Sequence, residues 1–385
     1  MKLPALEKAK VFGKTVFLRA DLDVPLSATS NQQLAISDVE DDTRLKAALP
    51  TIEYLLKHGA KVILAGHLGR PKPMNQESSI RRPELMPKGI MNQEFSLLPV
   101  AQWFSRKFKV QSSKFKVSTI GDFEGWELSD NLFLLENLRF YKGEENPSTS
   151  SGLEFARKLS SLADIYVNDA FAVCHRAHAS IVGVPKYLPH FAGLRLQEEI
   201  KVLSSVLENP NRPLVLIIGG AKIETKLPLV EKMRDFADYV LVGGKIAKEI
   251  TVFLKAQQQK VKERKATLLV ANLNQDGFDI TPKSVDDFLQ IISLAKTVVW
   301  NGPVGLVQSS KLKVKSSGED TERGTRELAK GIVNSKAYTV VGGGDTVGFL
   351  RNLGLLDKFS FVSTGGGAML EFLSGKRLPG LAILF

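Results

Sequence analysis

The stretch AYTVVGGGDT, residues 337–346, carries the pattern that decides the fold. A short apolar run rich in β-branched residues passes directly into three glycines and a polar turn, as a buried strand with a tight connection does. Similar runs recur along the chain, and each is followed by a segment with helical periodicity. We predict strands at Thr15–Leu18, Lys61–Leu64, Leu132–Leu135, Ile165–Asn168, Leu214–Ile218, Tyr239–Val242, Thr297–Trp300, Ala337–Val341 and Phe359–Ser363.

Amphipathic segments lie between these runs and predict helices. The clearest are Ala47–His58, Gly152–Ala163, Ser284–Ala295 and Thr321–Asn334. Strands that alternate with helices predict parallel sheets with helices on both faces. Because a chain of 385 residues with this many strands exceeds one open sheet, we expect an α/β protein of two doubly wound, Rossmann-like domains.

The joint between the domains is predicted near Pro185–Gly193, where a proline and a glycine precede the helical pattern Leu194–Leu207. We therefore expect one domain in residues 1–190 and another in residues 191–370, joined by a hinge helix. The proline- and charge-rich stretch at residues 71–89 is expected to be an exposed loop.

Composition narrows the class of protein. Hydrophobic residues make up 43% and charged residues 24% of the chain, which excludes collagen-like and disordered classes. Cys174 is the lone cysteine, so no intrachain disulfide forms. The sequence shows neither a membrane-spanning apolar run nor a signal-peptide pattern, and we expect a cytoplasmic protein.

The charge balance points to an anionic partner. The chain carries 52 lysine and arginine residues against 41 acidic ones, a net charge of +11, and the excess is spread over both halves. Such an excess suits small anionic substrates, and it equally suits nucleic acid. Charge alone leaves both classes open.

In the second half, strands end in glycine-rich turns. These are GGAKIETK (219–226), GGK (243–245), NGPVG (301–305), GGGDT (342–346) and TGGG (364–367). Glycine lets the backbone approach a ligand closely, and the N–H groups of a following helix face phosphate. One such turn would indicate only a tight connection, whereas five together predict an extended phosphorylated ligand. Neither a Walker A loop nor G-x-G-x-x-G occurs, which argues against the usual P-loop and dinucleotide sites.

In the first half, the strand ends carry cations instead. Arginines stand at or after the predicted strand ends, and one precedes a helix: Arg19, Arg70, Arg139, Arg176 and Arg44. The arginine fork binds phosphate and carboxylate with two parallel hydrogen bonds. One surface arginine would mean little, but a ring of them predicts a site for such groups.

Eight ordered motifs together identify a family. They are RADLDVPL (19–26), HLGRPK (67–72), LLENLRFYKGEE (134–145), VNDAFAVCHRAHAS (167–180), GGAKIETK (219–226), KTVVWNGPVG (296–305), VVGGGDT (340–346) and STGGGAMLEFL (363–373). Along essentially its whole length the sequence resembles the phosphoglycerate kinases. The resemblance implies reversible phosphoryl transfer between Mg-ATP and 3-phosphoglycerate, giving ADP and 1,3-bisphosphoglycerate, by a monomeric enzyme.

The resemblance also implies a bilobal fold with a hinge that closes the cleft. The lobe of residues 1–190 would bind 3-phosphoglycerate, and residues 371–385 would cross back to it. The lobe of residues 191–370 would bind the nucleotide. Because the acceptor carboxylate is already ionised, this transfer needs positioning and charge stabilisation rather than a general base.

Carried over residue by residue, the resemblance implies two binding sets. The acid-substrate set is Asp21, Asp23, Arg44, His67, Arg70, Arg139 and Arg176. The nucleotide set is Gly220, Lys222, Lys226, Gly243, Gly244, Asn301, Gln308, Gly343, Gly344, Asp345 and Thr346. It implies catalytic contacts to the transferring phosphoryl group from Arg44, Lys226, Gly366 and Gly367, and it makes Asp345 the Mg²⁺ ligand.

Some positions depart from the family pattern. Asp23 stands where the family usually has asparagine, which puts an acid next to an anionic substrate. Gln308 stands where a glutamate usually holds the ribose hydroxyls, so the preference for ATP over other nucleotides is open. The loop at residues 71–89 is longer than its family counterpart.

Two alternatives of other classes are a basic two-domain nucleic-acid-binding protein and an inactive scaffold with the kinase fold. The first explains the net charge but not the glycine turns, and the expected aromatic-plus-basic clusters are missing. Intact Arg44, Lys222, Lys226 and Asp345 argue against the second.

Overall fold

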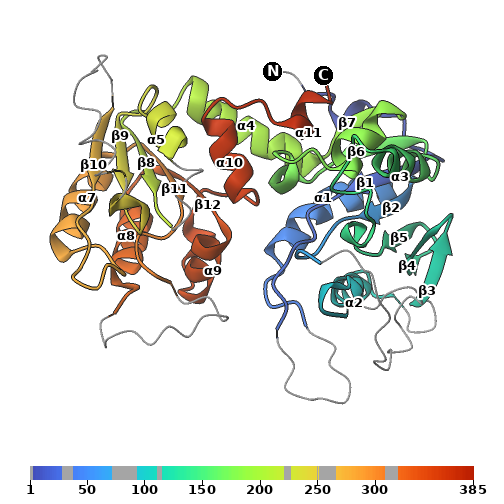
Figure 1. Cartoon of the computed structure of the whole chain (residues 1–385), viewed down its shortest axis with the longest axis horizontal. Coiled ribbons are helices and arrows are strands. Elements are labelled where there is room, and N and C mark those ends of the chain that lie inside the picture. Colours follow the sequence, from blue (N-terminus) through green and yellow to red (C-terminus); the bar gives the residue numbers. More distant parts are fainter. Residues whose placement is uncertain are drawn as a thin grey trace. The chain divides into compact units, whose positions relative to one another are not determined.

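A computed structural model describes residues 3–27, 38–71, 93–110, 115–220, 227–248, 250, 266–307 and 320–385. The chain divides into two compact units, each built around its own sheet (Figure 1). The first unit holds residues 1–199 and 377–385, and the second holds residues 200–376. The last residues of the chain therefore return to the first unit.

The first unit contains a mixed sheet in the order β3-β4-β5-β2-β1-β6-β7. Its strands are β1 (Thr15–Arg19), β2 (Lys61–Ala65), β3 (Lys116–Ile120), β4 (Phe123–Ser129), β5 (Leu132–Leu135), β6 (Ile165–Asn168) and β7 (His190–Ala192). Its helices are α1 (Thr43–Lys57), α2 (Leu98–Lys107), α3 (Ser150–Ser160) and the short α11 (Pro379–Ala382). The strands from β5 to β7 in this order run parallel, whereas β4 pairs antiparallel with both β3 and β5.

Both faces of this sheet are covered. On one face, Val16 and Leu18 are buried in a core to which α1 and α2 contribute. On the other face, Phe17 and Tyr166 are fully buried, with their rings stacked 6.1 Å apart. A strand buried on both faces appears in sequence as a continuous apolar run.

The second unit contains a fully parallel sheet in the order β10-β9-β8-β11-β12-β13. Its strands are β8 (Leu214–Ile218), β9 (Tyr239–Val242), β10 (Thr267–Val270), β11 (Thr297–Asn301), β12 (Tyr338–Gly342) and β13 (Phe361–Val362). Its helices are α5 (Leu227–Met233), α7 (Pro282–Leu294), α8 (Arg323–Asn334), α9 (Gly344–Asn352) and α10 (Gly366–Leu373). Ile217 and Trp300 pack with residues of α7 and α8 on one face, while Leu216 and Val299 are buried on the other.

These two α/β units confirm the predicted fold class, and each of the nine predicted strands is present within a few residues. Four strands lie outside the prediction. β3 and β4 form the edge of the first sheet, where polar residues alternate with apolar ones, and β10 is half-buried at the edge of the second. β7 has only three residues, and its place in the sheet comes from its parallel pairing with β6.

The chain changes unit within a helix. The predicted joint, Pro185–Gly193, contains β7, whose pairing with β6 makes it part of the first sheet. The division comes later, between Glu199 and Ile200, inside α4 (Leu194–Glu208).

The first turn of α4 is fixed by side chains of the first unit. The N–H of Leu194 donates to Oγ1 of Thr51 at 2.9 Å, and the N–H of Leu196 donates to Oδ1 of Asp169 at 3.1 Å. Burial raises the pKa of Asp169 to about 6, although hydrogen bonds from the Thr51 side chain and from the backbone of Leu196 oppose the shift. Thr51 lies on α1, the helix whose first turn carries Arg44.

The C-terminal segment packs tightly against the first unit. The N–H of Gly380 donates to the backbone oxygen of Cys174 at 2.9 Å, and Nδ2 of Asn168 donates to the oxygen of Gly380 at 3.2 Å. A Cβ on Gly380 would lie 2.9 Å from Cα of Cys174, so only glycine fits this approach.

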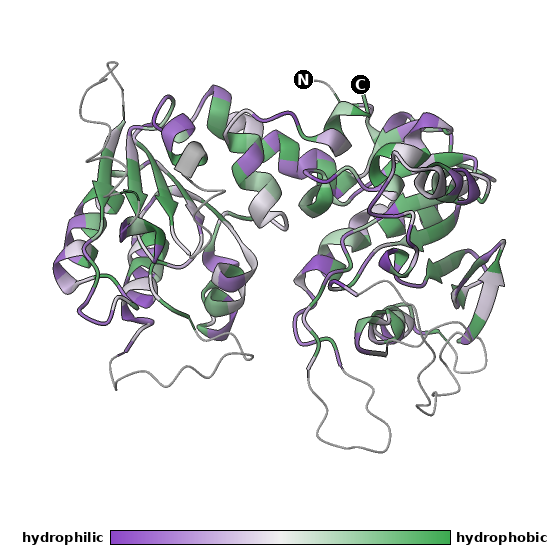
Figure 2. Cartoon of the chain, viewed as in Figure 1, coloured by the Kyte–Doolittle hydropathy of each residue, from purple (hydrophilic) through white to green (hydrophobic). Residues whose placement is uncertain are grey.

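Figure 2 shows hydrophobic residues concentrated in the strands of each unit and hydrophilic residues on parts of the surrounding helices. Within the described ranges, no helix combines the length and the apolar character that crossing a bilayer requires.

We predict that Thr51→Val destabilises the protein by about 1–3 kcal/mol, because it leaves the partly buried N–H of Leu194 without its acceptor. The free energy of unfolding in urea measures the loss. Ser161→Ala is the control, since this exposed hydroxyl donates to the backbone oxygen of Lys158 in its own helical turn. Equal effects of the two substitutions would contradict an anchoring role for Thr51.

Candidate functional site

The strand ends of the first unit bring charged side chains to one edge of the sheet. Arg19 ends β1, His67 follows β2, Arg139 lies in the turn after β5, and Arg176 follows β6. Arg44 lies in the first turn of α1. Because the carboxyl ends of parallel strands meet at one edge, residues from distant parts of the sequence gather there.

Arg19 is fully buried and anchors this edge. Its Nε donates to Oγ of Ser180 at 2.9 Å, and its Nη2 donates to Nδ1 of His67 at 3.0 Å. A carboxylate oxygen of Glu144 lies 4.0 Å from Nη2, and Glu144 accepts from the N–H and the hydroxyl of Ser180 at 2.9 and 2.6 Å. The buried positive charge is therefore both paired and hydrogen-bonded.

Two histidines at this edge are neutral. Burial, and then the charge of Arg19, lowers the pKa of His67 well below its ordinary value. The same causes lower the pKa of His178 to about 3. Because a guanidinium can only donate, Nδ1 of His67 accepts from Arg19 and Nε2 carries the proton. His67 therefore presents an N–H to the site rather than a base.

Arg44 is held by two aspartates. Its Nη1 donates to Oδ1 of Asp21 at 3.2 Å and to the backbone oxygen of Asp23 at 2.9 Å. Burial lowers the pKa of Arg44, but the charges of Asp21 and Asp23 more than offset this and the net shift is upward. Burial raises the pKa of Asp21, against the opposing charge of Arg44. The guanidinium is thus charged and oriented before any substrate arrives.

Arg139 brings an incompletely bonded guanidinium to the same edge. Its Nη1 donates to the backbone oxygen of Gly69, and its Nε lies 3.1 Å from a carboxylate oxygen of Glu145. Its buried Nη2 has no hydrogen-bond partner among the described residues. A buried donor of this kind favours binding of an anion, because leaving it without an acceptor is costly.

Two further arginines add positive charge around Arg139. The pKa of Arg176 is lowered, mainly by burial and next by the charge of Arg70. Burial, and then the charge of Arg176, lowers the pKa of Arg139. Arg70 itself is exposed. Mutual repulsion of three guanidinium groups is relieved by an anion that binds between them, so this edge is suited to phosphate or carboxylate.

A buried carboxylate fixes the turn that carries Arg139. Glu136 accepts from the N–H groups of Leu97 and Asn137 and from the hydroxyl of Ser96, each at 2.7 Å. Oδ1 of Asn137 then accepts from the N–H of Arg139 at 3.0 Å. Burial raises the pKa of Glu136 to about 7, despite these hydrogen bonds.

Several supporting residues lie outside the two binding sets that the resemblance implies, and one of them, Arg19, belongs to the predicted ring of arginines but is fully buried. They are Arg19, Glu136, Asn137, Glu144 and Ser180. All five fall inside the quoted motifs, and each is a polar or charged residue that the structure buries. Membership of the motifs is visible in the sequence, but it does not distinguish a residue that contacts a ligand from one that supports its neighbours.

In the second unit, three glycine turns interlock at the carboxyl edge of the sheet. The N–H of Gly220 donates to the oxygen of Pro303 at 2.7 Å, and that of Gly244 donates to the oxygen of Val304 at 2.8 Å. A Cβ on Gly244 would lie 2.8 Å from the nitrogen of Gly220, and one on Gly243 would lie 2.7 Å from the Val304 side chain. Only glycines allow this approach of backbone to backbone and to the Val304 side chain.

The ends of β11 and β12 join the starts of α9 and α10. Nδ2 of Asn301 donates to the oxygen of Gly366 at 2.9 Å, and Oγ1 of Thr346 accepts from the N–H of Gly302 at 3.1 Å. Gly343 has a φ of +97°, and a Cβ on Gly366 would lie 2.6 Å from Cα of Gly343. Two helix N-termini therefore share this edge, and the N–H groups of their first turns favour phosphate.

Asp345 places a carboxylate beside these N–H groups. It lies in the first turn of α9, after Gly344, and is exposed, while Gly367 lies in the first turn of α10. The described residues contain no group of three or more His, Cys, Asp or Glu side chains that could hold a metal by themselves. One carboxylate next to a phosphate site nevertheless fits Mg²⁺, which binds one or two carboxylates together with substrate phosphates.

The structure thus gathers the predicted acid-substrate residues at one edge of the first unit and the described nucleotide residues at the carboxyl edge of the second. Lys222, Lys226 and Gln308 lie outside the described residues, as does almost all of the predicted 71–89 loop.

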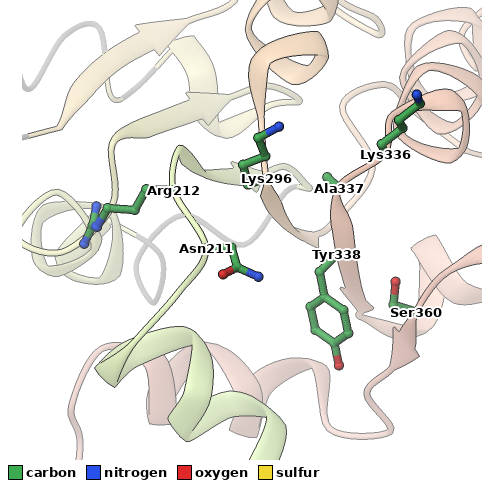
Figure 3. A pocket seen from close by; sticks show the side chains of 7 residues that line it. All are labelled: Asn211, Arg212, Lys296, Lys336, Ala337, Tyr338 and Ser360. Atoms are coloured by element: carbon green, nitrogen blue, oxygen red, sulfur yellow. The ribbon is translucent and has the colours of Figure 1, made fainter.

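A pocket of about 620 Å³ opens at the opposite, amino edge of the second sheet (Figure 3). It is lined by Asn211, Arg212, Lys296, Lys336, Ala337, Tyr338 and Ser360. Nη1 of Arg212 lies 2.7 Å from Oδ1 of Asp238, so its charge is already paired. Lys296 and Lys336 follow the C-termini of α7 and α8, where cations offset the negative end of the helix dipole. These local roles account for the basic lining.

The comparisons with known proteins agree with the motifs. The family model for phosphoglycerate kinase matches residues 6–275 and 262–376. The chain belongs to the phosphoglycerate kinase family. The phosphoglycerate kinase of Leptospira biflexa is 37% identical over 100% of this chain and 98% of the relative, and that of Desulforudis audaxviator is 38% identical over 97% of each.

Solved phosphoglycerate kinases share the fold. That of Coxiella burnetii aligns with a TM-score of 0.72 and 33% identity, covering 100% of this chain and 99% of the other. That of Pyrococcus horikoshii aligns with a TM-score of 0.74 and 27% identity, covering 99% and 98%. These matches confirm the family and make the chain a phosphotransferase. They give no support to the nucleic-acid-binding alternative.

We predict that Glu136 makes the protein less stable as the pH rises from about 4.5 to about 7. Its pKa is about 7 in the folded protein against an ordinary 4.5, so the folded state binds more protons in this window and stability falls with pH. Glu136→Gln should remove this fall, a relative gain on the order of 3 kcal/mol at pH 7.

Urea unfolding at a series of pH values tests this expectation. Glu154→Gln, a substitution at an exposed acid on α3, is the matched control and should leave the pH dependence of the parent. Parallel stability profiles for the parent and Glu136→Gln would show that Glu136 is charged in the folded protein at lower pH than we infer.

Proposed function

We propose that this chain transfers a phosphoryl group reversibly between Mg-ATP and the carboxylate of 3-phosphoglycerate, giving ADP and 1,3-bisphosphoglycerate. Family membership supports the reaction class. The observation that carries the proposal for this chain is the edge of the first unit, where the charges of Arg139 and Arg176 act on each other and Nη2 of Arg139 is buried with no acceptor among the described residues. Such an edge suits a substrate with a phosphate and a carboxylate.

The chemistry fits residues that position and stabilise charge. The acceptor carboxylate is ionised at neutral pH, so no proton has to be removed from it before it attacks. The neutral His67 and His178 agree with this requirement, because each offers hydrogen bonds rather than a basic nitrogen poised near pH 7. The oriented guanidinium of Arg44 would compensate charge on the group in flight.

We assign the acid-substrate role to the unit of residues 1–199 and the nucleotide role to residues 200–376. In the first, Arg70, Arg139 and Arg176 would hold the remote phosphate, with Asp21, Asp23 and His67 around the rest of the molecule. In the second, the glycine turns at Gly220, Gly243 and Gly244 would face the base, and Asn301, Gly343, Gly344 and Thr346 would bind the phosphate chain. By resemblance, Lys222, Lys226 and Gln308 complete this set.

Mg²⁺ would be held by Asp345 together with the nucleotide phosphates, and it would supply charge compensation at the phosphoryl group. The first turns of α9 and α10 support this role, because their N–H groups face the same edge. Gly366 and Gly367 would direct backbone N–H groups at the migrating phosphoryl group.

Transfer requires the reacting atoms to approach to about 3–3.5 Å. Because the two sets of residues belong to different units, we propose that hinge rotation near Pro185–Leu207 and Ser363–Gly367 completes the site. We also propose that the enzyme is a cytoplasmic monomer. Small-angle scattering with and without both substrates tests the rotation, and unchanged profiles would count against it.

A coupled assay with 3-phosphoglycerate and a panel of nucleoside triphosphates tests the proposed reaction. ATP-dependent turnover is expected, and the panel reports whether Gln308 broadens the choice of nucleotide. A salt-dependent gel shift with no turnover would instead favour the nucleic-acid-binding alternative.

We predict that Arg44→Ala lowers kcat on the order of 10²–10⁴-fold, because it removes an oriented charge that acts on the transition state. Lys226→Ala should do the same by resemblance. Arg139→Ala should mainly raise the KM for 3-phosphoglycerate, since the remote phosphate is held equally before and after transfer. Arg44→Lys should also lower kcat strongly, because an ammonium group cannot reproduce the planar fork of the guanidinium.

Steady-state kinetics with each substrate varied separates these effects. Arg106→Ala is the control, an exposed arginine on α2 whose only described ion pair is with Asp38 at 3.6 Å. If Arg44→Ala raised only KM, the catalytic role of Arg44 would be wrong.

We predict that Asp345→Asn raises the Mg²⁺ concentration for half-maximal activity by about tenfold or more, because the neutral amide binds this cation more weakly. Magnesium titration of activity at fixed ATP measures the shift. Asp357→Asn, at an exposed acid of the same unit, should leave it unchanged. A fall in kcat with an unshifted magnesium curve would exclude Asp345 as the metal ligand.

A further inference from the structure

Asp23 places a carboxylate among the hydrogen-bond donors of the first unit's edge. Its Oδ1 accepts from the N–H of Gly69 at 2.8 Å. Its Oδ2 lies 3.8 Å from Nη1 of Arg44 and 3.8 Å from Nε2 of His67. A backbone N–H, a guanidinium and a neutral imidazole N–H therefore face this one carboxylate, and each is a donor that would also bind the carboxylate or phosphate of a ligand.

Asp23 and Asp21 differ in their access to solvent. The side chain of Asp21 is 6% exposed, whereas that of its partner Arg44 is 27% exposed. The side chain of Asp23 is 38% exposed. An anion entering from solvent can therefore reach Asp23 and the guanidinium of Arg44, whereas Asp21 is buried.

The charge of Asp23 opposes any anion that binds these donors. Two carboxylates that share a site repel each other, so the incoming group must either displace Asp23 from Gly69, Arg44 and His67 or bind beside a like charge. Either course costs binding free energy. The cost is paid by substrate and product alike, because both are anions at this end.

We propose that Asp23 acts as an internal counter-anion. Its carboxylate occupies the hydrogen-bond donors that would bind the reacting end of the substrate, and it thereby keeps the affinity of this edge for anions low. This inference rests on the proposed function for the identity of the substrate. Because differences in affinity at one site mostly appear in the dissociation rate, the charge of Asp23 speeds release of the bound acid.

A purely structural role is the competing explanation. Gly69 has a φ of +59°, and the Asp23 hydrogen bond could serve only to hold that turn. The two roles separate cleanly by substitution. Asp23→Asn retains an acceptor for the N–H of Gly69 and removes the charge, whereas Asp23→Ala removes both.

Calorimetric titration with 3-phosphoglycerate, and separately with inorganic sulfate, tests the proposal on the full-length protein. We expect Asp23→Asn to lower both dissociation constants by about tenfold, the effect of removing one opposing charge. Asp38→Asn is the matched control, because it removes one exposed charge from the same unit, away from Gly69, and should leave both constants as in the parent.

The outcomes distinguish the inference from the proposed function. Equal dissociation constants for the parent and Asp23→Asn, or weaker binding by Asp23→Asn, would overturn the counter-anion role. Tighter sulfate binding by Asp23→Asn, with no binding of 3-phosphoglycerate to any variant, would support the counter-anion role and overturn the proposed substrate. Thermal unfolding of each variant without ligand reports any loss of folding separately.

Discussion

The acid-substrate edge depends on the burial of one positive charge, that of Arg19. Taking a guanidinium out of water costs several kcal/mol unless it is paired and hydrogen-bonded. Glu144, Ser180 and His67 meet that requirement, and in doing so each acquires a single orientation. The imidazole proton is assigned to Nε2, and the segment that follows Arg176 is tied down through Ser180. The residues that face ligand are thereby arranged by one that does not.

The second unit builds its edge from backbone groups rather than from charged side chains. Its turns approach so closely that a Cβ on Gly219 would lie 2.1 Å from the backbone oxygen of Pro303. Glycine is required by this approach, and the N-termini of α9 and α10 lie at the same edge of the sheet. Backbone N–H groups cannot change their charge or swing away. They suit the phosphates of a large nucleotide, which must be held in one position.

The two edges therefore differ as their ligands do. In the proposed function, the arginine forks would recognise a small acid by its charges, and the backbone of the glycine turns would recognise a nucleotide by its phosphates. His67 and His178 at the first edge are not bases near neutral pH, in keeping with a reaction whose acceptor is already an anion. Asp23 is the exception, since its charge opposes the ligand that its neighbours attract.

The sequence by itself determined the strands that are buried on both faces, the glycine turns, the ring of arginines and the family, because these are local patterns of composition and order. The tertiary structure decided which of the polar residues face inward. Arg19 and Ser180 stand 161 positions apart, and no local pattern shows that they bond. It also decided the edge strands β3 and β4 and the change of unit within α4. Burial and pairing are made between distant segments, so only the folded chain reveals them.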